Sequence, residues 1–492
     1  MKHPYFKNTL KFNACAVLCV VFNFCFSTTL HASEKPNLIV ILTDDQGYAD
    51  VGFNGSKEIF TPHIDRIATE GTRFTQGYVS YPVCGPSRAG LLTGRYQDRF
   101  GFVGNPTIDP TVDNAGIPKD EKNIAEVLKP AGYTSGILGK WHMGTHPDLH
   151  PNKRGFDHFF GFLSGGHRYF PEELNINDLS QVTKKWQWYN TRLLRNNERV
   201  DIKEYLTDEL SNDAVDFIKR EKDNPFFLYV AYNAPHAPLQ ATQEYLDRYP
   251  HIKNKRRKTY AAMISSVDDG VGKILDTLKE QGIDDNTIIF FLSDNGGPLE
   301  KNASDNGVLR GGKGAPFEGG VRVPFAVRWP AKIPAGLDYH EPVISLDILA
   351  TIVDEAKVDI SKNKPLDGVN LVPFLTGENK GQPHDVLFWR SHGRWQASLT
   401  NNTKMIKQKN SQMLYDINTD ISEQNNVYKK NKSQYNKLQQ SYQQWNEELE
   451  DGAFPKLGSW DFKKQNAEAV NAEASKNQKN NKKSAEQSDA QE

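Results

Sequence analysis

One cysteine of this chain stands among residues that suit catalysis. Cysteine occurs at positions 15, 19, 25 and 84, and Cys84 lies in the stretch YPVCGPSRAGLLTGRY, residues 81–96. Because proline is favoured in the first turn of a helix, Pro86 predicts that Cys84 lies at a helix N-terminus, where backbone N–H groups favour an anion. A thiolate in that position is a candidate nucleophile.

Oxygen-bearing side chains follow two apolar runs. The run NLIVIL, residues 37–42, precedes Asp44 and Asp45, and NTIIFFL, residues 286–292, precedes Asp294 and Asn295. Carboxylate and amide oxygens favour Ca²⁺ or Mg²⁺ over zinc. Taken singly, such residues are often only a solvated loop or a turn. Their repeated placement after apolar runs favours one shared metal site.

Cationic and protonatable side chains occupy similar positions. Lys140 and His142 follow the run TSGIL, residues 134–138, and His236 follows PFFLYVAY, residues 225–232. Lys313 stands in a glycine-rich segment. A divalent cation with several such groups suits a tetrahedral oxyanion, which is either sulfate or phosphate. A thiolate, however, is a poor match for a hard cation.

The elements that must position these residues alternate between strands and helices. Helical patterns cover residues 121–132 and 260–282, between the apolar runs. This alternation predicts an α/β fold with a large, mostly parallel sheet flanked by helices. In such sheets ligands bind beyond the carboxyl ends of the strands, so the polar residues after the strands are expected to meet there.

The N-terminus predicts export. A lysine-bearing start and the apolar run ACAVLCVVFNFCF, residues 14–26, precede small and polar residues. This pattern is typical of a signal peptide, residues 1–32, and places the protein in the periplasm or outside the cell. A lipoprotein is the alternative, but Cys25 lacks the small residue expected before an acylated cysteine, so no stable membrane anchor is expected. Cleavage leaves Cys84 as the sole cysteine, without a disulfide partner.

The rest of the chain is predicted to form two folded parts and a tail. The catalytic domain is expected over residues 33–375 and a smaller α+β subdomain over residues 376–462. Residues 463–492 are almost all Lys, Asn, Ala, Glu, Gln and Ser and are predicted to be disordered. With 60 basic and 61 acidic residues there is no global basic field, so no nucleic-acid partner is expected.

A family resemblance accounts for the isolated cysteine. The residues CGPSR, continuing to LLTGR, resemble the C-x-P-S-R signature of type I sulfatases in the alkaline phosphatase superfamily. Further segments resemble family elements in the same order: ILTDDQGYADVGFNG, TPHIDRIATEGTRFTQGY, YTSGILGKWHMG, NAPHAPL, FLSDNGG, LRGGKGAPFEGGVRVPFAVRWP and LYDINTDISEQNNV. The resemblance implies that a maturation enzyme oxidises Cys84 to formylglycine.

The resemblance also implies a role for each candidate residue. The implied Ca²⁺ ligands are Asp44, Asp45, Asp294, Asn295 and the formylglycine at Cys84. Arg88 steadies the formylglycine hydrate, and Lys140 and Lys313 hold the sulfate oxygens. His142 acts on the hydrate, and His236 lies near the leaving oxygen, with His236 or Lys313 as the acid. One hydroxyl of the hydrate attacks sulfur, and the other then expels sulfate and restores the aldehyde.

The substrate is less constrained by sequence. The pattern is similar to marine bacterial polysaccharide sulfatases, and especially to iota-carrageenan sulfatases that remove the 4-O-sulfate of galactose. Candidate sugar-binding residues lie in two clusters of aromatic and basic side chains: His167 and Arg168, and then Trp389, Arg390, His392, Arg394 and Trp395. The alternatives are a sulfatase of ulvan, fucoidan or a glycosaminoglycan, a formylglycine-dependent phosphonate monoester hydrolase or phosphodiesterase, and an inactive sugar-binding relative. No metal or nucleophile position looks lost.

Overall fold

The computed structural model describes Met1 and residues 35–400 and 402–454. The expected signal peptide and C-terminal tail lie outside the described residues. Among the described helices, none has the length and apolarity that crossing a membrane requires.

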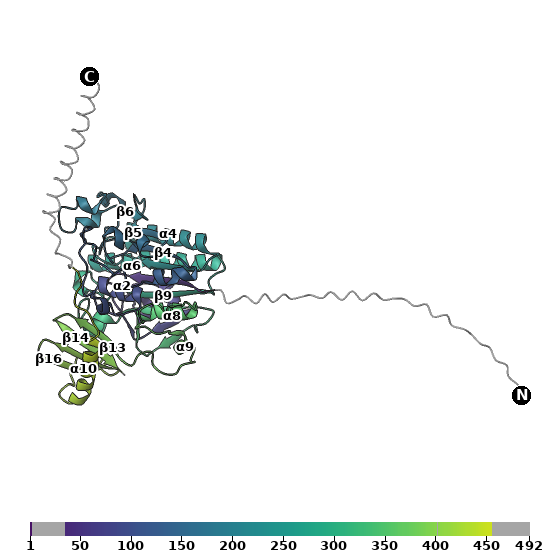
Figure 1. Ribbon diagram of the computed structural model, residues 1–492. Helices are drawn as coiled ribbons and strands as arrows, with labels where there is room; N and C mark the ends of the chain where they lie inside the picture. The colour runs from purple at the N-terminus through teal and green to yellow at the C-terminus, as the bar shows by residue number, and fades with distance from the viewer. Residues whose placement is uncertain (2–34, 401, 455–492) are drawn as a thin grey trace, which may run out of the picture. The chain divides into compact units, whose positions relative to one another are not determined.

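A ten-stranded sheet forms the centre of the catalytic part (Figure 1). The five adjacent strands β9, β1, β8, β4 and β5 are parallel, and antiparallel pairs occur toward both edges. The expectation of a mostly parallel α/β sheet is confirmed. In spatial order the strands are β11 (Leu337–Tyr339), β2 (Thr72–Phe74), β10 (Phe325–Arg328), β9 (Thr287–Ser293), β1 (Asn37–Thr43), β8 (Phe226–Ala231), β4 (Thr134–Lys140), β5 (His158–Phe162), β6 (Leu193–Arg195) and β7 (Glu198–Val200).

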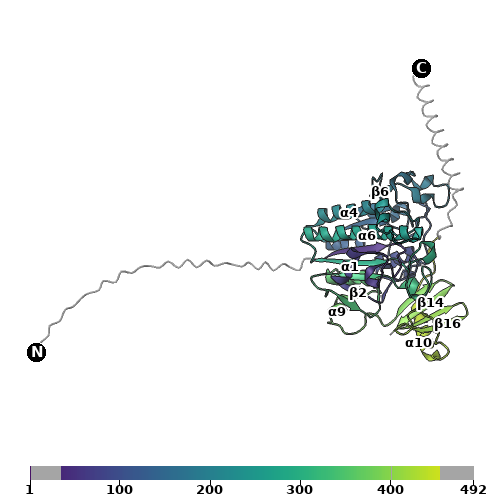
Figure 2. The ribbon, with the colours of Figure 1, turned by 180° about the vertical axis from the view of Figure 1, so that it is seen from behind.

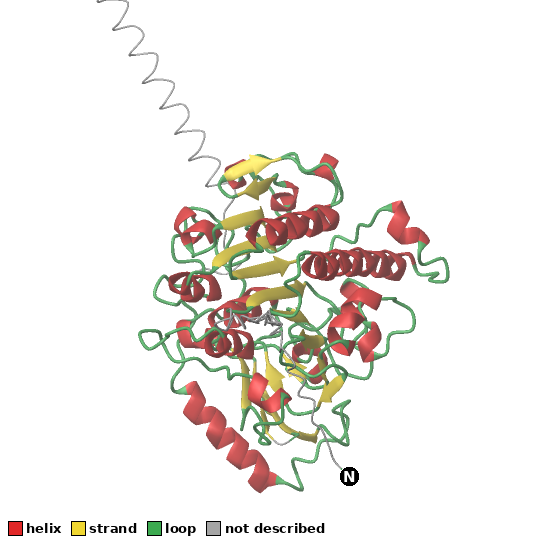
Figure 3. Ribbon diagram, turned by 90° about the vertical axis from the view of Figure 1, so that its right-hand side faces the viewer, coloured by secondary structure: helices red, strands yellow, loops and turns green. Residues whose placement is uncertain are grey.

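Helices cover both faces of this sheet (Figure 3). Strand β1 shows why: Leu38, Val40 and Leu42 enter one apolar core, and Ile39 and Ile41 enter the other. Each such side chain contributes about 1.5–3 kcal/mol when fully buried, so both faces need a cover. One face packs α2 (Cys84–Thr93), α3 (Ile124–Leu128), α8 (Asp347–Glu355) and α9 (Val372–Leu375). The other packs α1 (Pro62–Thr69), α4 (Leu206–Glu221), α5 (Gln243–Asp247) and α6 (Lys255–Glu280), with α4 and α6 side by side (Figure 2).

A second, four-stranded antiparallel sheet begins at Leu387. It consists of β13 (Leu387–Ser391), β14 (Trp395–Thr400), β15 (Thr403–Gln408) and β16 (Ser411–Asp416), and α10 (Lys432–Asn446) packs on it. The expected α+β character of the C-terminal subdomain is therefore confirmed, while the boundary at residue 375/376 stays a prediction. Its core includes Tyr78 and Ile344, from the small pair β3 (Gly77–Tyr78) and β12 (Val343–Ile344), so it is continuous with the catalytic part.

Candidate active site

The polar residues meet at the carboxyl ends of four neighbouring strands. Strands β9, β1, β8 and β4 are consecutive in the sheet, and Thr43 of β1 is in register with Ser293 of β9. The residues after these two positions, Asp44 and Asp294, therefore lie side by side at the sheet edge. The same edge receives Lys140 from β4. The structure therefore brings these strand ends together at one edge of the sheet, while their service as one site stays a prediction.

The chain bends sharply after β1. Asp45 has a φ of 64°, a left-handed conformation that Asp adopts more readily than most residues. The Asp45 backbone N–H donates to Oδ1 of Asp294, at 3.2 Å, and Nδ2 of Asn295 donates to Oδ1 of Asp45, at 2.7 Å. These bonds hold the two acidic pairs together although they are about 250 residues apart in the sequence.

Cys84 is the first residue of α2, as the sequence predicts. All ten residues of this helix are buried, so its N-terminus is a rigid part of the site. The Gly85 backbone N–H donates to Oδ1 of Asn105, at 3.0 Å, and the Cys84 thiol lies 3.7 Å from the same oxygen. A Cβ at position 85 would lie 2.7 Å from that oxygen, so a larger residue there would displace the Asn105 amide. No recognisable motif surrounds Asn105, so the sequence alone does not reveal this contact.

Among the described residues, the three shortest ion pairs at the site each join a different cation to a different carboxylate. They are Arg88–Asp294 (2.8 Å), Lys140–Asp44 (2.6 Å) and Lys313–Asp45 (2.6 Å). Three carboxylates and three cations compensate one another in charge. A bound divalent cation would leave an excess of two positive charges, and such an excess attracts a sulfate ester anion.

The donor set fits a hard metal ion. Oδ1 of Asp44 and Oδ1 of Asn295 are buried and have no hydrogen-bond partner among the described residues. One ligand atom from each of Asp44, Cys84 and Asp294 lies within 4.8 Å of the others. Buried acceptors of this kind are costly unless something binds them. Apart from the sulfur, which oxidation of Cys84 would replace with oxygen, every donor is an oxygen, as Ca²⁺ or Mg²⁺ prefers.

Known proteins with the same sequence features identify the family. The family model described as Sulfatase matches residues 36–358, and the model described as N-sulphoglucosamine sulphohydrolase, C-terminal, matches residues 313–451. The chain belongs to the sulfatase family. It is therefore a sulfuric ester hydrolase of the type I group within the alkaline phosphatase superfamily, and the family implies a formylglycine and a metal ion.

Individual relatives agree over most of the chain. The sulfatase is 36% identical to N-acetylgalactosamine-6-sulfatase of Homo sapiens, over 75% of this chain and 71% of that protein. It is 33% identical to the uncharacterized sulfatase YdeN of Escherichia coli strain K12, over 76% and 72%. The crystal structure of Ps i-CgsB is 42% identical, covers 87% of this chain and 96% of its own, and superposes with a TM-score of 0.81. Ps i-CgsB has also been solved in complex with k-i-k-neocarrahexaose.

Two histidines of this sulfatase lie near the charged residues of the site. Neither ring nitrogen of His142 has a hydrogen-bond partner among the described residues, although the side chain is buried. Burial, together with Lys140 and Arg88, holds the pKa of His142 well below its usual range, so its imidazole is neutral and able to accept a proton. Nδ1 of His236 donates to the backbone carbonyl of Ala237, which leaves Nε2 directed toward Asp45 at 3.7 Å. Burial lowers the pKa of His236 to about 4, although Asp45 opposes this.

The Lys313 amine lies between the acidic cluster and the nucleophile position. Its Nζ atom is 2.6 Å from Oδ1 of Asp45 and 3.8 Å from Sγ of Cys84. Burial would lower the pKa of Lys313, but Asp45, Cys84 and Asp44 outweigh it and raise this pKa well above its usual value. Burial likewise raises the pKa of the Cys84 thiol, but Lys140 and Lys313 lower it overall. Both effects favour the charged forms.

The C-terminal subdomain anchors the segment that carries Lys313. At the start of this segment Nη1 of Arg310 donates to the backbone carbonyl of Glu423, at 2.8 Å. At its end, where α7 (Glu318–Val321) begins, buried Lys404 pairs with Glu318 at 2.7 Å and with Glu423 at 3.3 Å. No local motif marks this network, because its members are separated by about 100 residues in the sequence.

The two residues of the first candidate sugar-binding cluster, His167 and Arg168, have different environments. Arg168 is partly exposed and pairs with Glu173 at 2.8 Å, so it stays a prediction. His167 is completely buried and stacked on Phe162, and its two ring nitrogens lie 2.9 and 2.7 Å from the backbone carbonyls of Arg168 and Thr191. Because no ring nitrogen of His167 is free for a sugar, the expectation for this residue is corrected: it has a structural position, and its carbonyl accepts from Asn233.

The second cluster also divides. Arg390 is 6% exposed. Its guanidinium donates hydrogen bonds to Asp98, at 2.7 Å, to Asn446 and to the backbone carbonyl of Glu450. The expectation that Arg390 grips substrate is corrected, because its donors are occupied within the protein. Trp389 is fully buried and donates to the carbonyl of Val79. Trp395 is mostly buried but lines an open hollow, together with His392 and Arg394.

Proposed function

We propose that this sulfatase removes the 4-O-sulfate of galactose units in iota-carrageenan, in the periplasm or outside the cell. The main support for this substrate is the similarity to Ps i-CgsB, a protein crystallised with k-i-k-neocarrahexaose. The sulfatase is 42% identical to it over 87% of the chain. The proposal includes oxidation of Cys84 to formylglycine by a maturation enzyme and binding of one Ca²⁺ by Asp44, Asp45, Asp294, Asn295 and the modified residue 84.

The site geometry supports this chemistry. The formylglycine hydrate at position 84 would supply an oxygen nucleophile. A bound Ca²⁺ ion would supply positive charge for the sulfate oxygens. Arg88 is buried between Asp294 and the backbone carbonyl of Lys140, so it is held rigidly behind position 84. Lys140 and Lys313 present ammonium donors at the acidic cluster, where they can stabilise the charge of a transferring sulfate group.

Proton movement falls to three side chains. The leaving sugar oxygen needs a proton, because an alkoxide is a poor leaving group. Nζ of Lys313, which is protonated, can donate it from beside Asp45, and Nε2 of His236 can donate one only after it has taken up a proton. The unpartnered nitrogens of neutral His142 can accept a proton from residue 84 in the step that releases sulfate.

Other sulfated glycans remain the alternative for the substrate. The relative that is 36% identical acts, by its name, on N-acetylgalactosamine 6-sulfate, a sulfated sugar of the galactose type. The crystal structure of the phosphonate monoester hydrolase of Agrobacterium radiobacter shares only the fold, at 20% identity and a TM-score of 0.59. Ps i-CgsB is the more similar of these proteins, and we therefore favour carrageenan.

A panel of defined substrates tests the proposal. The protein, produced together with a formylglycine-generating enzyme, is incubated with oligosaccharides of iota-carrageenan, ulvan, fucoidan and chondroitin sulfate, and with a phosphonate monoester. Free sulfate and the mass and NMR spectrum of each product are measured. We expect sulfate release from iota-carrageenan with loss of the galactose 4-O-sulfate, and peptide mass spectrometry should find formylglycine at position 84. Sulfate release from another glycan alone would make that glycan the substrate. An active protein with an unmodified Cys84 thiol would overturn the mechanism.

A further inference from the structure

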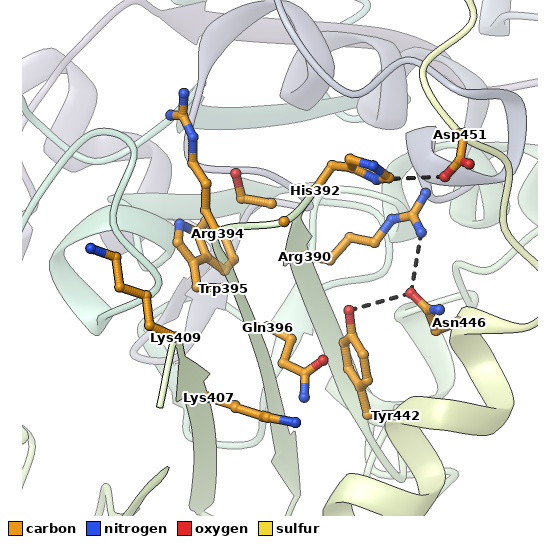
Figure 4. Close-up of a pocket in the computed structure, with 12 residues that line it drawn as sticks. Arg390, His392, Arg394, Trp395, Gln396, Lys407, Lys409, Tyr442, Asn446 and Asp451 are labelled. Atoms are coloured by element: carbon orange, nitrogen blue, oxygen red, sulfur yellow. Dashed lines mark hydrogen bonds and ion pairs between the residues drawn. The ribbon is translucent and has the colours of Figure 1, made fainter. Parts of the chain in front are cut away.

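An open hollow in the C-terminal subdomain extends the active site. Its volume is about 340 Å³, and it is lined mainly by the turn between β13 and β14, by the end of β15 and by α10 (Figure 4). A second hollow of about 600 Å³ is lined by Lys313 and the residues after it. The two hollows share Gly393, Arg394, Trp395 and Lys409. One continuous surface therefore leads from Lys313 into the subdomain.

Three cations on this surface have no counter-charge. Arg394, Lys407 and Lys409 are exposed, and none of them forms an ion pair with another residue in the described ranges. Figure 4 shows these side chains around the hollow with no dashed line to a carboxylate. The other charges there are compensated: Arg390 pairs with Asp98, and His392 lies 3.5 Å from the exposed Asp451. The surface is thus positive where it is open.

The second sheet brings these cations together. In the β14–β15 ladder Trp395 is opposite Gln408 and Gln396 is opposite Lys407, so the β13–β14 turn and the β15–β16 turn lie at the same end of the sheet. Gly393 has a φ of 69°, and the Arg394 backbone N–H donates to the carbonyl of Ser391, which makes a tight turn. Trp395 packs near Tyr81 and forms a mostly buried base beside the exposed cationic side chains.

We propose that Arg394, Lys407 and Lys409 form a second sulfate-binding subsite, for a sulfate on a sugar next to the unit that is hydrolysed. This inference rests on the proposed function, because it requires a sulfated glycan in the site. Arginine offers a fork of donors and lysine a point charge, and both suit a sulfate group that stays bound and does not react. The hollow is open, as a polymer that continues beyond the active site requires. The enzyme therefore prefers glycans with sulfates on neighbouring units over singly sulfated ones.

Charge removal tests the subsite. In one variant Arg394, Lys407 and Lys409 are all replaced by glutamine. The matched control replaces three other exposed lysines of the same subdomain, Lys429, Lys430 and Lys432, and so removes the same net charge. For each protein kcat/KM is measured on a carrageenan oligosaccharide with several sulfates, on one with a single sulfate on the hydrolysed unit, and on 4-methylumbelliferyl sulfate.

We expect the subsite variant to lower the ratio of kcat/KM for the multiply sulfated over the singly sulfated oligosaccharide by about tenfold, mainly through KM. The control should keep the wild-type ratio. Added NaCl should reduce the ratio of the wild type more than that of the variant, because salt screens exposed charges. An unchanged ratio in an active subsite variant, or an equal loss in the control, overturns the inference. A wild-type protein that releases sulfate from none of the three substrates contradicts the proposed function instead.

Discussion

The Nζ atom of Lys313 lies 2.6 Å from Oδ1 of Asp45 and 3.8 Å from Sγ of Cys84, although the three residues come from three distant segments. The amine thus bridges the acidic cluster and the position of the nucleophile. Its ion pair with Asp45 directs it, and the charge of Asp45 keeps it protonated.

Lys313→Ala should reduce kcat on every sulfate ester. If the amine stabilises the charge that develops on sulfate or on the leaving oxygen, its loss should cost on the order of 10²- to 10³-fold in kcat, as for the loss of one preorganised donor. The measurement is steady-state kinetics on the carrageenan oligosaccharide and on a small aryl sulfate. Lys301→Ala, at an exposed lysine between β9 and α7, is the control. A kcat within twofold of the wild-type value on both substrates would show that Lys313 has no catalytic role.

Asp294→Ala should abolish metal binding and activity together. The change removes one of three clustered carboxylates and leaves the buried Arg88 without its 2.8 Å partner. Because the second effect can also disturb folding, Asp294→Asn is the companion variant: it keeps the shape and one oxygen but removes the charge. Bound calcium is measured by mass spectrometry after dialysis, and folding by thermal unfolding. A folded variant that keeps both its bound calcium and full activity would show that the metal site is misplaced.

Lys404→Met should weaken both stability and turnover. Lys404, Glu318 and Glu423 are all fully buried; Arg322 still pairs with Glu318 at 3.2 Å when the lysine is removed, but the nearby Glu423 loses its ion-pair partner. Breaking a buried pair in this way costs about 3–5 kcal/mol in the free energy of unfolding, which urea denaturation measures. Because Glu318 and Glu423 anchor the segment with Lys313, kcat should fall more than KM changes. Lys437→Met, at an exposed position of α10, should alter neither quantity. A stable variant with normal kcat would show that the network does not position Lys313.

Asp268→Asn should stabilise the protein at high pH. Asp268 is 2% exposed, and its Oδ1 accepts from the backbone N–H groups of His63 and Ile64 at the start of α1. Burial raises its pKa from 3.8 to about 7, although those two bonds oppose the shift. The folded state therefore holds a proton more tightly than the unfolded state, and this contribution is complete below pH 3.8 and is lost as pH rises to about 7.

Asparagine keeps the accepting oxygen at position 268 and carries no charge. The melting temperature of Asp268→Asn should therefore exceed that of the wild type at pH 8, and the difference should shrink toward pH 4. Asp269→Asn, at a neighbouring carboxylate that pairs with Arg248, is the matched control and should lose stability at pH 8 or leave it unchanged. A wild-type advantage at pH 8 over Asp268→Asn would contradict the assignment.

The sequence by itself determined the chemistry and the order of elements. Each apolar run and the polar residues that end it are adjacent in the chain, so β1 with Asp44, and β9 with Asp294, are visible as local patterns. The same holds for the helix start at Cys84, which Pro86 signals locally. Local hydrophobic periodicity and turn chemistry suffice for such features, because their physical cause lies within a few residues.

Only the tertiary structure decided which side chains meet. Strands β9 and β1 are neighbours in the sheet, although they are far apart in the sequence. Their pairing depends on the packing of both sheet faces, which no local pattern encodes. Asn105 reached Cys84, and Lys404 reached Glu318, without any motif. Arg390 and Arg394 differ for the same physical reason, although both lie in one basic stretch. The buried carboxylate of Asp98, from a distant segment, pairs with Arg390, whereas Arg394 lines the open hollow and is available to a ligand. The availability of a charged side chain depends on its neighbours in space, and those neighbours are set by long-range burial.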